Sequence, residues 1–272
     1  MELKIDSRIE LNDGNAIPRL GLGVWLINSG KSCESAVRAA LDGGYRHIDT
    51  AAYYGNEDSV GKAIRDSGIR REEIVVATKI WNSHHSDPER AVNGSLRRLA
   101  VDYIDLYLIH YPVRERLQTW QALTALQARG KIRSLGVSNF TVRHLKELLA
   151  ASTNVPTVNQ VEFHPYLYQR ELLEFCRNQK IVLEAYSPLT HGERLNDRKL
   201  VAIAKKYQKS TAQVLIRWAL QHDTIVIPKS ANPKRISEDA DVYDFEISPA
   251  DMELLDGFNE NLRTCWDPTR AP

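Results

Sequence analysis

The sequence has few cysteines, no long apolar run and almost no net charge. Its cysteines, Cys33, Cys176 and Cys265, are far apart and odd in number. This pattern fits neither a disulfide framework nor a zinc site and favours reduced thiols. No window approaches the roughly 18 consecutive apolar residues that a membrane-spanning helix needs. The formal net charge of +1 gives no reason to expect nucleic acid or an anionic membrane surface as a partner.

Leader and metal-ligand patterns are missing as well. The first residues, Met1 to Asp6, are polar and show no charged stretch followed by an apolar one, as a secretory leader would. No spaced set of His, Cys and Glu suggests a metal site, since His84 and His85 are adjacent and such a pair is typical of an exposed loop. We therefore expect a cytoplasmic protein that binds no metal.

Short strand-like runs recur along the chain, with helical patterns between them. They lie near residues 20–25, 45–50, 74–80, 103–110, 132–138, 157–163, 181–187 and 224–229. Most begin about 24–29 residues apart, the length of one strand-helix unit. Eight such units predict an α/β fold, a closed (β/α)8 TIM barrel, and the length of 272 residues suits one domain spanning 1–272. An open doubly wound sheet is the alternative.

Local signals place several helix starts and depart from the repeat at the ends. Capping residues precede apolar periodicity at Asp87-Pro88, Thr141 and Ser210, which predicts helices there. Residues 9–18 predict an N-terminal β-hairpin that turns at Asp13-Gly14 and plugs the N-terminal mouth of the barrel. The long interval before the last strand leaves room for more than one helix, and Ser248 begins one of the extra C-terminal helices.

Three ionisable residues end three successive apolar runs. Asp49, Lys79 and His110 stand at the ends of the second, third and fourth expected strands, and Tyr54 follows Asp49 by five residues. Because strand C-termini of a parallel barrel open onto one face, these side chains are expected to meet there. Taken alone, Asp49 reads as a helix cap and His110 as a core histidine, whereas a buried Lys79 needs a partner such as Asp49.

Together these four side chains suit the movement of a proton. A phenol with an ordinary pKa of about 10 holds its proton at neutral pH. A neighbouring ammonium favours the phenolate, so we expect Lys79 to lower the pKa of Tyr54 and Asp49 to hold Lys79. His110 would align the oxygen that Tyr54 protonates. The arrangement suits a carbonyl that becomes an alkoxide when a hydride is supplied.

A basic segment offers a site for the hydride carrier. Lys229 and Ser230 end the eighth expected strand, and Arg235 follows, in the region where barrels often bind phosphate. A solvated basic turn is the alternative interpretation. The usual dinucleotide fingerprint is absent, because Leu26 stands where a third glycine would follow Gly21 and Gly23. No Tyr-x-x-x-Lys motif occurs, which argues against a short-chain dehydrogenase.

Segments over nearly the whole chain resemble the aldo-keto reductase superfamily. They are Gly44-Tyr45-Arg46-His47-Ile48-Asp49-Thr50-Ala51, Tyr54-Gly55-Asn56-Glu57, Thr78-Lys79-Ile80-Trp81, Asp105-Leu106-Tyr107-Leu108-Ile109-His110, Gly136-Val137-Ser138-Asn139-Phe140, Asn159-Gln160-Val161-Glu162, Ala185-Tyr186-Ser187-Pro188-Leu189 and Ile227-Pro228-Lys229-Ser230. The compact length is similar to the microbial branch that contains 2,5-diketo-gluconate reductases.

The resemblance implies NADPH-dependent reduction of aldehydes and ketones to alcohols. Tyr54 would be the general acid, completed by Asp49, Lys79 and His110. Ser138, Asn139 and Gln160 would hydrogen-bond the nicotinamide carboxamide, and Tyr186 would stack on its ring. The remaining cofactor contacts that it implies are Ser187 and Leu189 at the pyrophosphate, Lys229, Ser230 and Arg235 at the 2′-phosphate, and Glu238 at the adenine.

The chain also departs from the family pattern. Asp239 stands where Asn is common, and His191 stands where a small hydroxyl residue often contacts the phosphates. Tyr111 replaces a frequent tryptophan, and only five residues, Val113 to Leu117, separate Pro112 from the next expected helix. We expect a shallow substrate pocket of broad specificity. Its candidate walls, which also have an alternative role in ordinary packing, are Trp25, Tyr53, Trp81 and Tyr111.

Two other function classes remain open at this level. The chain could be a nicotinamide-binding regulatory subunit with little turnover, since such relatives exist in the superfamily. It could also be a barrel lyase or isomerase that uses Lys79 as a nucleophile. The intact set of four site residues favours a reductase. We expect its partner to be a small-molecule carbonyl substrate and the protein to be a monomer.

Overall fold

Eight parallel strands lie side by side in the order β3 to β10 and form the wall of a barrel in the computed structural model, which describes residues 3–272. Residues 1–2 of the predicted domain lie outside the described residues. The strands are β3 (Leu22–Gly23), β4 (His47–Asp49), β5 (Val75–Ile80), β6 (Ile104–Ile109), β7 (Ile132–Ser138), β8 (Val158–Glu162), β9 (Val182–Tyr186) and β10 (Ile225–Ile227). All eight lie within the predicted runs; β7 has the predicted bounds, and the other seven are somewhat shorter.

Backbone hydrogen bonds between the first and last strands close the barrel. Leu20 and Val226 form a parallel bridge. Gly21 N donates to Val226 O at 2.9 Å, and Gly23 N donates to Pro228 O at 3.0 Å. The closed barrel that the strand count predicted is therefore confirmed, and the open doubly wound sheet is excluded.

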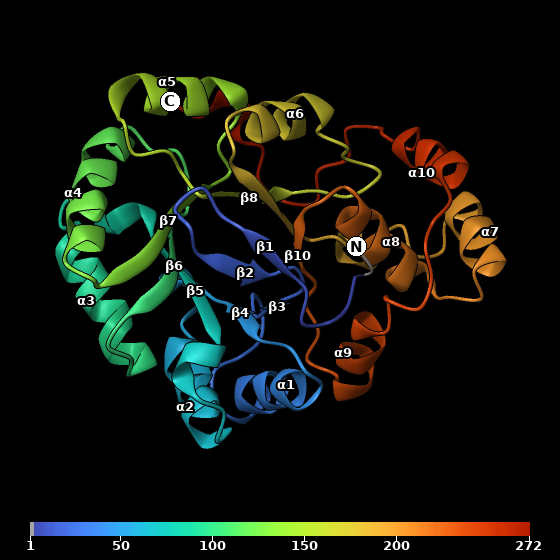
Figure 1. Cartoon of the computed structure of the whole chain (residues 1–272), viewed down its shortest axis with the longest axis horizontal. Helices are drawn as coiled ribbons and strands as arrows, with labels where there is room; N and C mark the ends of the chain where they lie inside the picture. The colour runs from blue at the N-terminus through green and yellow to red at the C-terminus, as the bar shows by residue number, and fades with distance from the viewer. Residues whose placement is uncertain (1–2) are drawn as a thin grey trace.

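Helices surround the strands on the outside (Figure 1). They are α1 (Lys31–Asp42), α2 (Glu57–Asp66), α3 (Pro88–Leu99), α4 (Arg116–Ala128), α5 (Val142–Ala151), α6 (Arg170–Asn178), α7 (Arg198–Lys206), α8 (Thr211–Gln221), α9 (Pro233–Ala240) and α10 (Pro249–Asp256). Two helices, α7 and α8, fill the long interval before β10, as expected. The helix at α10 confirms the predicted addition near the C-terminus.

The predicted helix starts carry side-chain caps. Asp87 accepts a hydrogen bond from Arg90 N, and Pro88 occupies the first turn of α3. Thr141 and Ser210 form capping boxes with His144 and Gln213. Such caps satisfy backbone N–H groups that have no partner inside the helix. They fix where each helix begins, and hence the length of each loop above the barrel.

A hairpin covers the N-terminal mouth of the barrel, as the sequence predicted. Strands β1 (Arg8–Glu10) and β2 (Ala16–Pro18) pair antiparallel and lie across the barrel in Figure 1. Ile9, Leu11 and Ile17 pack into the interior cluster that includes residues of β5, β6, β8 and β10. The connection spans residues 11–15, where Leu11 N donates to Asn15 O. It is longer than a two-residue Asp13-Gly14 turn.

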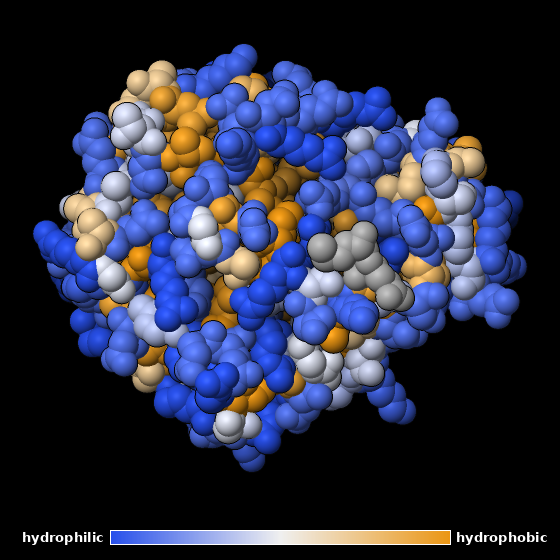
Figure 2. Space-filling model, viewed as in Figure 1, coloured by the Kyte–Doolittle hydropathy of each residue, from blue (hydrophilic) through white to orange (hydrophobic). Residues whose placement is uncertain are grey.

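The polarity of the barrel interior changes from the hairpin end to the C-terminal ends of the strands. Figure 2, which shows the hairpin side, is dominated by hydrophilic residues. Because side chains alternate along a strand, every second residue points into the barrel. At the lower levels many of these inward residues are apolar, such as Val75, Ala77 and Leu106. Towards the C-terminal ends of the strands they become polar and ionisable, which places the candidate site there.

Candidate active site

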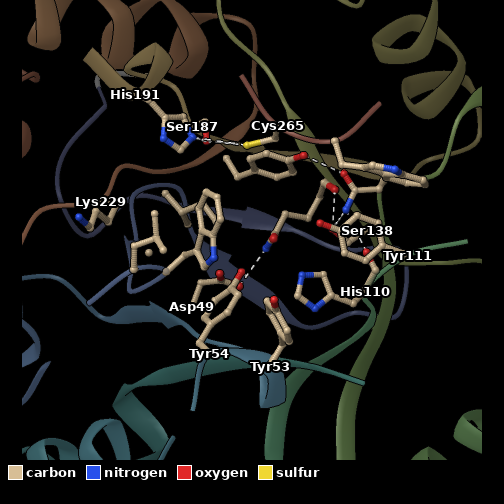
Figure 3. Close-up of a pocket in the computed structure, with 18 of the residues that line it drawn as sticks. Asp49, Tyr53, Tyr54, His110, Tyr111, Ser138, Ser187, His191, Lys229 and Cys265 are labelled. Atoms are coloured by element: carbon tan, nitrogen blue, oxygen red, sulfur yellow. Dashed lines mark hydrogen bonds between the residues drawn. The ribbon is translucent and has the colours of Figure 1, made fainter. Parts of the chain in front are cut away.

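The strand-end residues predicted to meet do so at the C-terminal end of the barrel. Asp49 ends β4, Lys79 is the penultimate residue of β5, and His110 directly follows β6. Tyr54 ends a short 3-10 helix, Ala52–Tyr54, just after β4. Asp49, Tyr54 and His110 line a cavity of about 500 Å³, which Figure 3 shows.

Lys79 is completely buried, and its ammonium is fully engaged. Its Nζ donates to both carboxylate oxygens of Asp49, at 2.7 and 2.8 Å, and to the backbone oxygen of Thr50 at 2.8 Å. A buried cation needs such partners because it has lost its hydration. Burial raises the pKa of Asp49, and the Lys79 ammonium and the Gln160 amide oppose that rise. The Asp49–Lys79 pair that the sequence predicted is confirmed.

Tyr54 lies next to this pair, with its hydroxyl 3.5 Å from Lys79 Nζ. Burial raises the pKa of Tyr54 well above its usual range, and the negative charge of Asp49 raises it further. The net lowering of this pKa that we expected from Lys79 does not occur in this structure. Burial disfavours the phenolate, Asp49 adds a negative charge nearby, and together they outweigh the attraction of the Lys79 ammonium. Tyr54 is therefore a firmly protonated phenol.

His110 faces Tyr54 across the cavity. The two rings meet edge to face with their centroids 5.8 Å apart. Burial, followed by the positive charge of Lys79, lowers the pKa of His110 well below its ordinary value. Its Nδ1 is buried without a hydrogen-bond partner among residues 3–272. His110 is thus a neutral imidazole, which can either donate or accept one hydrogen bond in the cavity.

The four residues predicted to hold a nicotinamide ring are brought together at the ends of β7, β8 and β9. Tyr186 Oη donates to Asn139 Oδ1 at 2.8 Å, and Ser138 Oγ donates to the backbone oxygen of Gln160 at 2.9 Å. Gln160 Nε2 donates to Asp49 Oδ2 at 2.9 Å. All four line the cavity. Their polar groups form a connected hydrogen-bond network that reaches from Tyr186 to Asp49.

A second group of predicted contacts lies after β9. Ser187 and Leu189 line the cavity. Ser187 Oγ lies 2.9 Å from His191 Nε2 and 3.7 Å from Cys265 Sγ; these residues cluster in Figure 3. His191 lines the cavity as well.

The basic segment is only partly in the cavity. Lys229 lines it and lies at one edge in Figure 3, with Tyr111 and Ser138 at the other. Ser230 is buried, and its hydroxyl is engaged with Asn232 of the same turn. Arg235 and Glu238 are exposed on α9 and are not among the lining residues. The structure thus places these last two outside the cavity.

Aromatic side chains form much of the cavity wall. Trp25, Tyr53, Trp81 and Tyr111 all line it, as predicted. The rings of Tyr53 and Trp81 stack with their centroids 3.8 Å apart, and Tyr111 stacks on His110 at 4.8 Å. Tyr111 follows His110 directly, and α4 begins at Arg116. The connection is therefore as short as the sequence indicated.

The C-terminal segment supplies wall residues that sequence reasoning missed. Cys265 and Trp266 line the cavity, and Trp266 meets Tyr111 edge to face at 5.0 Å. Glu162 holds this segment, since its carboxylate accepts hydrogen bonds from the backbone N–H groups of Thr264 and Cys265. The one available signal was an unexplained tryptophan in an irregular tail. Nothing in the local pattern linked it to β6 or β8.

Two kinds of feature are absent from residues 3–272. No cluster of three or more His, Cys, Asp or Glu side chains has the arrangement of a metal site in this part of the chain. None of the helices described is long and apolar enough to cross a membrane.

Comparison with known proteins identifies the family. The model of the aldo/keto reductase family matches residues 19–260, which include the three strand-end side chains and Tyr54. The chain belongs to the aldo/keto reductase family. It is therefore an oxidoreductase of this family, whose members generally use nicotinamide cofactors. The resemblance inferred from the sequence motifs is confirmed.

Several members of the family match this chain over almost its whole length. A glyoxal reductase of Bacillus subtilis is 46% identical over 271 residues, which cover 98% of each chain. The methylglyoxal reductase DkgA of Escherichia coli is 42% identical, with 96% of each chain covered. The crystal structure of an aldo/keto reductase from Brucella melitensis is 44% identical, covers 93% of this chain and 99% of its own, and superposes with a TM-score of 0.90.

Proposed function

We propose that this aldo/keto reductase reduces aldehydes and ketones to alcohols with NADPH, and that Tyr54 is its general acid. The observation that carries the proposal is the position of the Tyr54 hydroxyl, 3.5 Å from an ammonium that Asp49 holds at the floor of an aromatic cavity. A protonated phenol beside a fixed cation can give its proton to a carbonyl oxygen as negative charge develops there.

The residues around Tyr54 fit a nicotinamide nucleotide. The amide side chains of Asn139 and Gln160 and the hydroxyl of Ser138 offer donors and acceptors that complement a carboxamide, and all three line the cavity. Tyr186 provides an aromatic wall beside them. Lys229 lies at the far edge of the same cavity, where a cation suits phosphate. NADPH bound here would supply the hydride that a carbonyl carbon accepts.

Each member of the catalytic set has a distinct task in this proposal. Lys79, fixed by Asp49 and Thr50, keeps a positive charge next to Tyr54 without moving during the reaction. His110, as a neutral imidazole, donates a hydrogen bond to the substrate oxygen and orients it towards the Tyr54 hydroxyl. As negative charge builds on that oxygen, the Tyr54 proton moves to it, and Lys79 stabilises the phenolate that remains.

The proposed cofactor preference rests on the basic residues after β10. Lys229 and Ser230 stand at the end of the barrel wall, and Arg235 lies on the exposed side of α9. We assign these three to the 2′-phosphate of NADPH, and Glu238 to the adenine. Ser187 and Leu189 would border the pyrophosphate from the loop after β9. Arginine is suited to this role because its planar group can bind two phosphate oxygens at once.

The substrate class that we propose is small carbonyl compounds, including dicarbonyls such as glyoxal and methylglyoxal. Support comes from the two bacterial relatives with these activities in their names and from a cavity of about 500 Å³. The short loop after His110 removes one source of wall contacts, which favours broad specificity. Trp25, Tyr53, Trp81 and Tyr111 would contact the substrate through apolar surfaces.

Two alternatives are less well supported. A lyase or isomerase mechanism needs Lys79 as a free amine, but its Nζ makes three hydrogen bonds to Asp49 and Thr50 and has no exposure. A regulatory subunit does not require an intact proton-donating site, so the presence of such a site in this chain favours an enzyme. Every residue that the proposed reaction needs comes from one chain, so a monomer suffices for it, and we propose a monomeric enzyme. A cytoplasmic location is part of the same proposal.

Loss of NADPH absorbance tests the proposal. Purified protein is mixed with NADPH and a panel of aldehydes, ketones and dicarbonyls, and then with NADH in place of NADPH. We expect turnover of several small carbonyls with a preference for NADPH. Binding of NADPH without turnover of any carbonyl would favour the regulatory alternative. Trapping of a substrate on Lys79 by borohydride would favour the lyase.

A further inference from the structure

Below the proposed catalytic set lies a buried pair that the reaction does not use. Glu184 is the central residue of β9 and pairs with Gln160 of β8. His47 begins β4, two residues before Asp49; because side chains alternate along a strand, both point into the barrel. The side chains of His47 and Glu184 have no exposure, and His47 Nε2 lies 3.6 Å from Glu184 Oε1.

Neither side chain of this pair is satisfied by a hydrogen bond. Within residues 3–272, both carboxyl oxygens of Glu184 and both ring nitrogens of His47 lack a partner. The imidazole has room only because residue 21 is a glycine. A Cβ added to Gly21 would lie 2.7 Å from His47 Nδ1. Buried polar groups without partners are rare in proteins and require an explanation.

The balance of charge in the barrel explains why these buried polar groups lack partners. Two carboxyl groups, Asp49 and Glu184, lie near a single ammonium, that of Lys79. The N–H bonds of Lys79 are directed to Asp49 and Thr50, with the Tyr54 hydroxyl as a more distant acceptor at 3.5 Å. The Gln160 amide donates to Asp49 as well. An ionised Glu184 would therefore be a buried negative charge whose nearby donor, the Gln160 amide, already bonds Asp49, which is highly unfavourable.

We propose that Glu184 is a positioning residue that remains a neutral carboxylic acid beneath the catalytic set, with its proton directed towards the neutral imidazole of His47. In this state Lys79 interacts with one anion, Asp49, and keeps its geometry towards Tyr54. The pair thus holds one titrating proton, that of the Glu184 carboxyl, in addition to the N–H of the neutral imidazole. The location of that proton does not depend on the proposed function, whereas its effect on turnover does.

The electrostatics of the barrel agree with this assignment. Burial, followed by the negative charge of Asp49, raises the pKa of Glu184 to about 8, and Lys79 and Gln160 only partly oppose the rise. Burial and the charge of Lys79 lower the pKa of His47 to about 3. The charged groups facing Glu184 come from β4 and β5. Its neighbours in register are uncharged, namely Gln160 on β8 and Ile225 on β10.

Ionisation of Glu184 would lower the activity of the enzyme at alkaline pH. When Glu184 loses its proton, a second negative charge appears beside Asp49. That charge makes Tyr54 harder to ionise and competes with Asp49 for Lys79, so proton transfer slows. Tyr54 itself does not titrate in this range, because its pKa lies well above 10. The loss of activity near pH 8 would therefore report Glu184.

Infrared spectroscopy tests the location of the proton without any turnover. Asp239, whose pKa burial raises to about 7, is the other buried carboxyl that titrates nearby, so Asp239→Asn serves as the background. We expect this variant to show a protonated-carboxyl C=O band at pH 7 that disappears as the pH rises through about 8. Adding Glu184→Gln should remove that band. A spectrum that Glu184→Gln leaves unchanged at pH 7 overturns the proposal.

Single-turnover reduction with NADPH tests the effect on the reaction. In the wild-type enzyme the rate at pH 9 should be about fivefold lower than at pH 8, as for a single ionisation near pH 8. Glu184→Gln keeps a neutral group of the same size, so its rate ratio between these pH values should approach one. If this variant loses the infrared band but keeps the wild-type ratio of rates between pH 8 and pH 9, the positioning role of Glu184 is overturned. Failure of the wild-type enzyme to reduce any carbonyl would contradict the proposed function and leave the infrared result intact.

Discussion

Lys79 Nζ lies 2.7 Å from Asp49 Oδ1 and 2.8 Å from Asp49 Oδ2, and both side chains are almost completely buried. This pair joins two neighbouring strands of the barrel and fixes the charge beside Tyr54. Its two members depend on each other, since both are buried too deeply for water to replace the partner. The stability of the fold and the chemistry of the site are therefore linked at this contact.

Replacing Asp49 by Asn should destabilise the protein strongly. The variant leaves the Lys79 ammonium buried without a counter-charge, which typically costs about 3–5 kcal/mol in the free energy of unfolding. Urea denaturation at neutral pH measures this loss. Asp66→Asn is the matched control, because it breaks an exposed pair with Lys62 and should have a far smaller effect. Equal losses in the two variants would mean that Asp49 does not hold the charge of Lys79.

Replacing Arg235 by Ala should weaken NADPH binding selectively. If Arg235 contacts the 2′-phosphate, its loss should raise the Kd for NADPH by roughly tenfold or more and leave that for NADH nearly unchanged. Fluorescence titration measures both constants. Arg129→Ala is the control, since Arg129 follows α4 and pairs with Glu89, at the N-terminal end of β7. Equal losses for NADPH and NADH would remove the assignment.

Replacing Glu162 by Gln should loosen the C-terminal wall in a pH-dependent way. Burial alone would raise the pKa of Glu162, but hydrogen bonds from His164 and Thr264 bring it below its usual value. A lowered native pKa means that the ionised carboxylate adds stability above the unfolded pKa of about 4.5, and that this stability is lost as the pH falls through the native pKa.

The Glu162 variant should thus be less stable than the wild type at neutral pH by about 1–3 kcal/mol. The difference should shrink as the pH falls below about 4.5. Urea denaturation over a pH series gives the free energies of unfolding, and hydrogen exchange in residues 264–270 reports the local effect. A difference that stays constant from neutral to acid pH would show that the ionised carboxylate does not anchor the segment.

The fold could be predicted because its signals are local and repeated. Apolar runs end at Asp49, Lys79 and His110, and each sits at the end of a strand in the structure. The first strand is shorter than its apolar run, Leu22–Gly23 instead of 20–25. There the barrel is closed by backbone hydrogen bonds to β10, which no local pattern specifies.

Two features of the site could not be predicted because they depend on distances between remote segments. Cys265 and Trp266 reach the cavity through hydrogen bonds between Glu162 and a tail more than 100 residues later in the chain. The pKa of Tyr54 depends on how deeply the phenol is buried and on how near Asp49 lies to it. The sequence pairs Asp49 with Lys79 but does not say how near the anion lies to the phenol.

The most direct measurement of the central claim is single-turnover reduction by Tyr54→Phe, combined with NADPH titration of the same variant. Phenylalanine keeps the ring and removes the proton that the carbonyl oxygen is proposed to receive. We expect reduction to fall by about 10²-fold or more, with the Kd for NADPH nearly unchanged. A rate close to that of the wild type, measured in a variant that still binds NADPH, would contradict Tyr54 as the general acid.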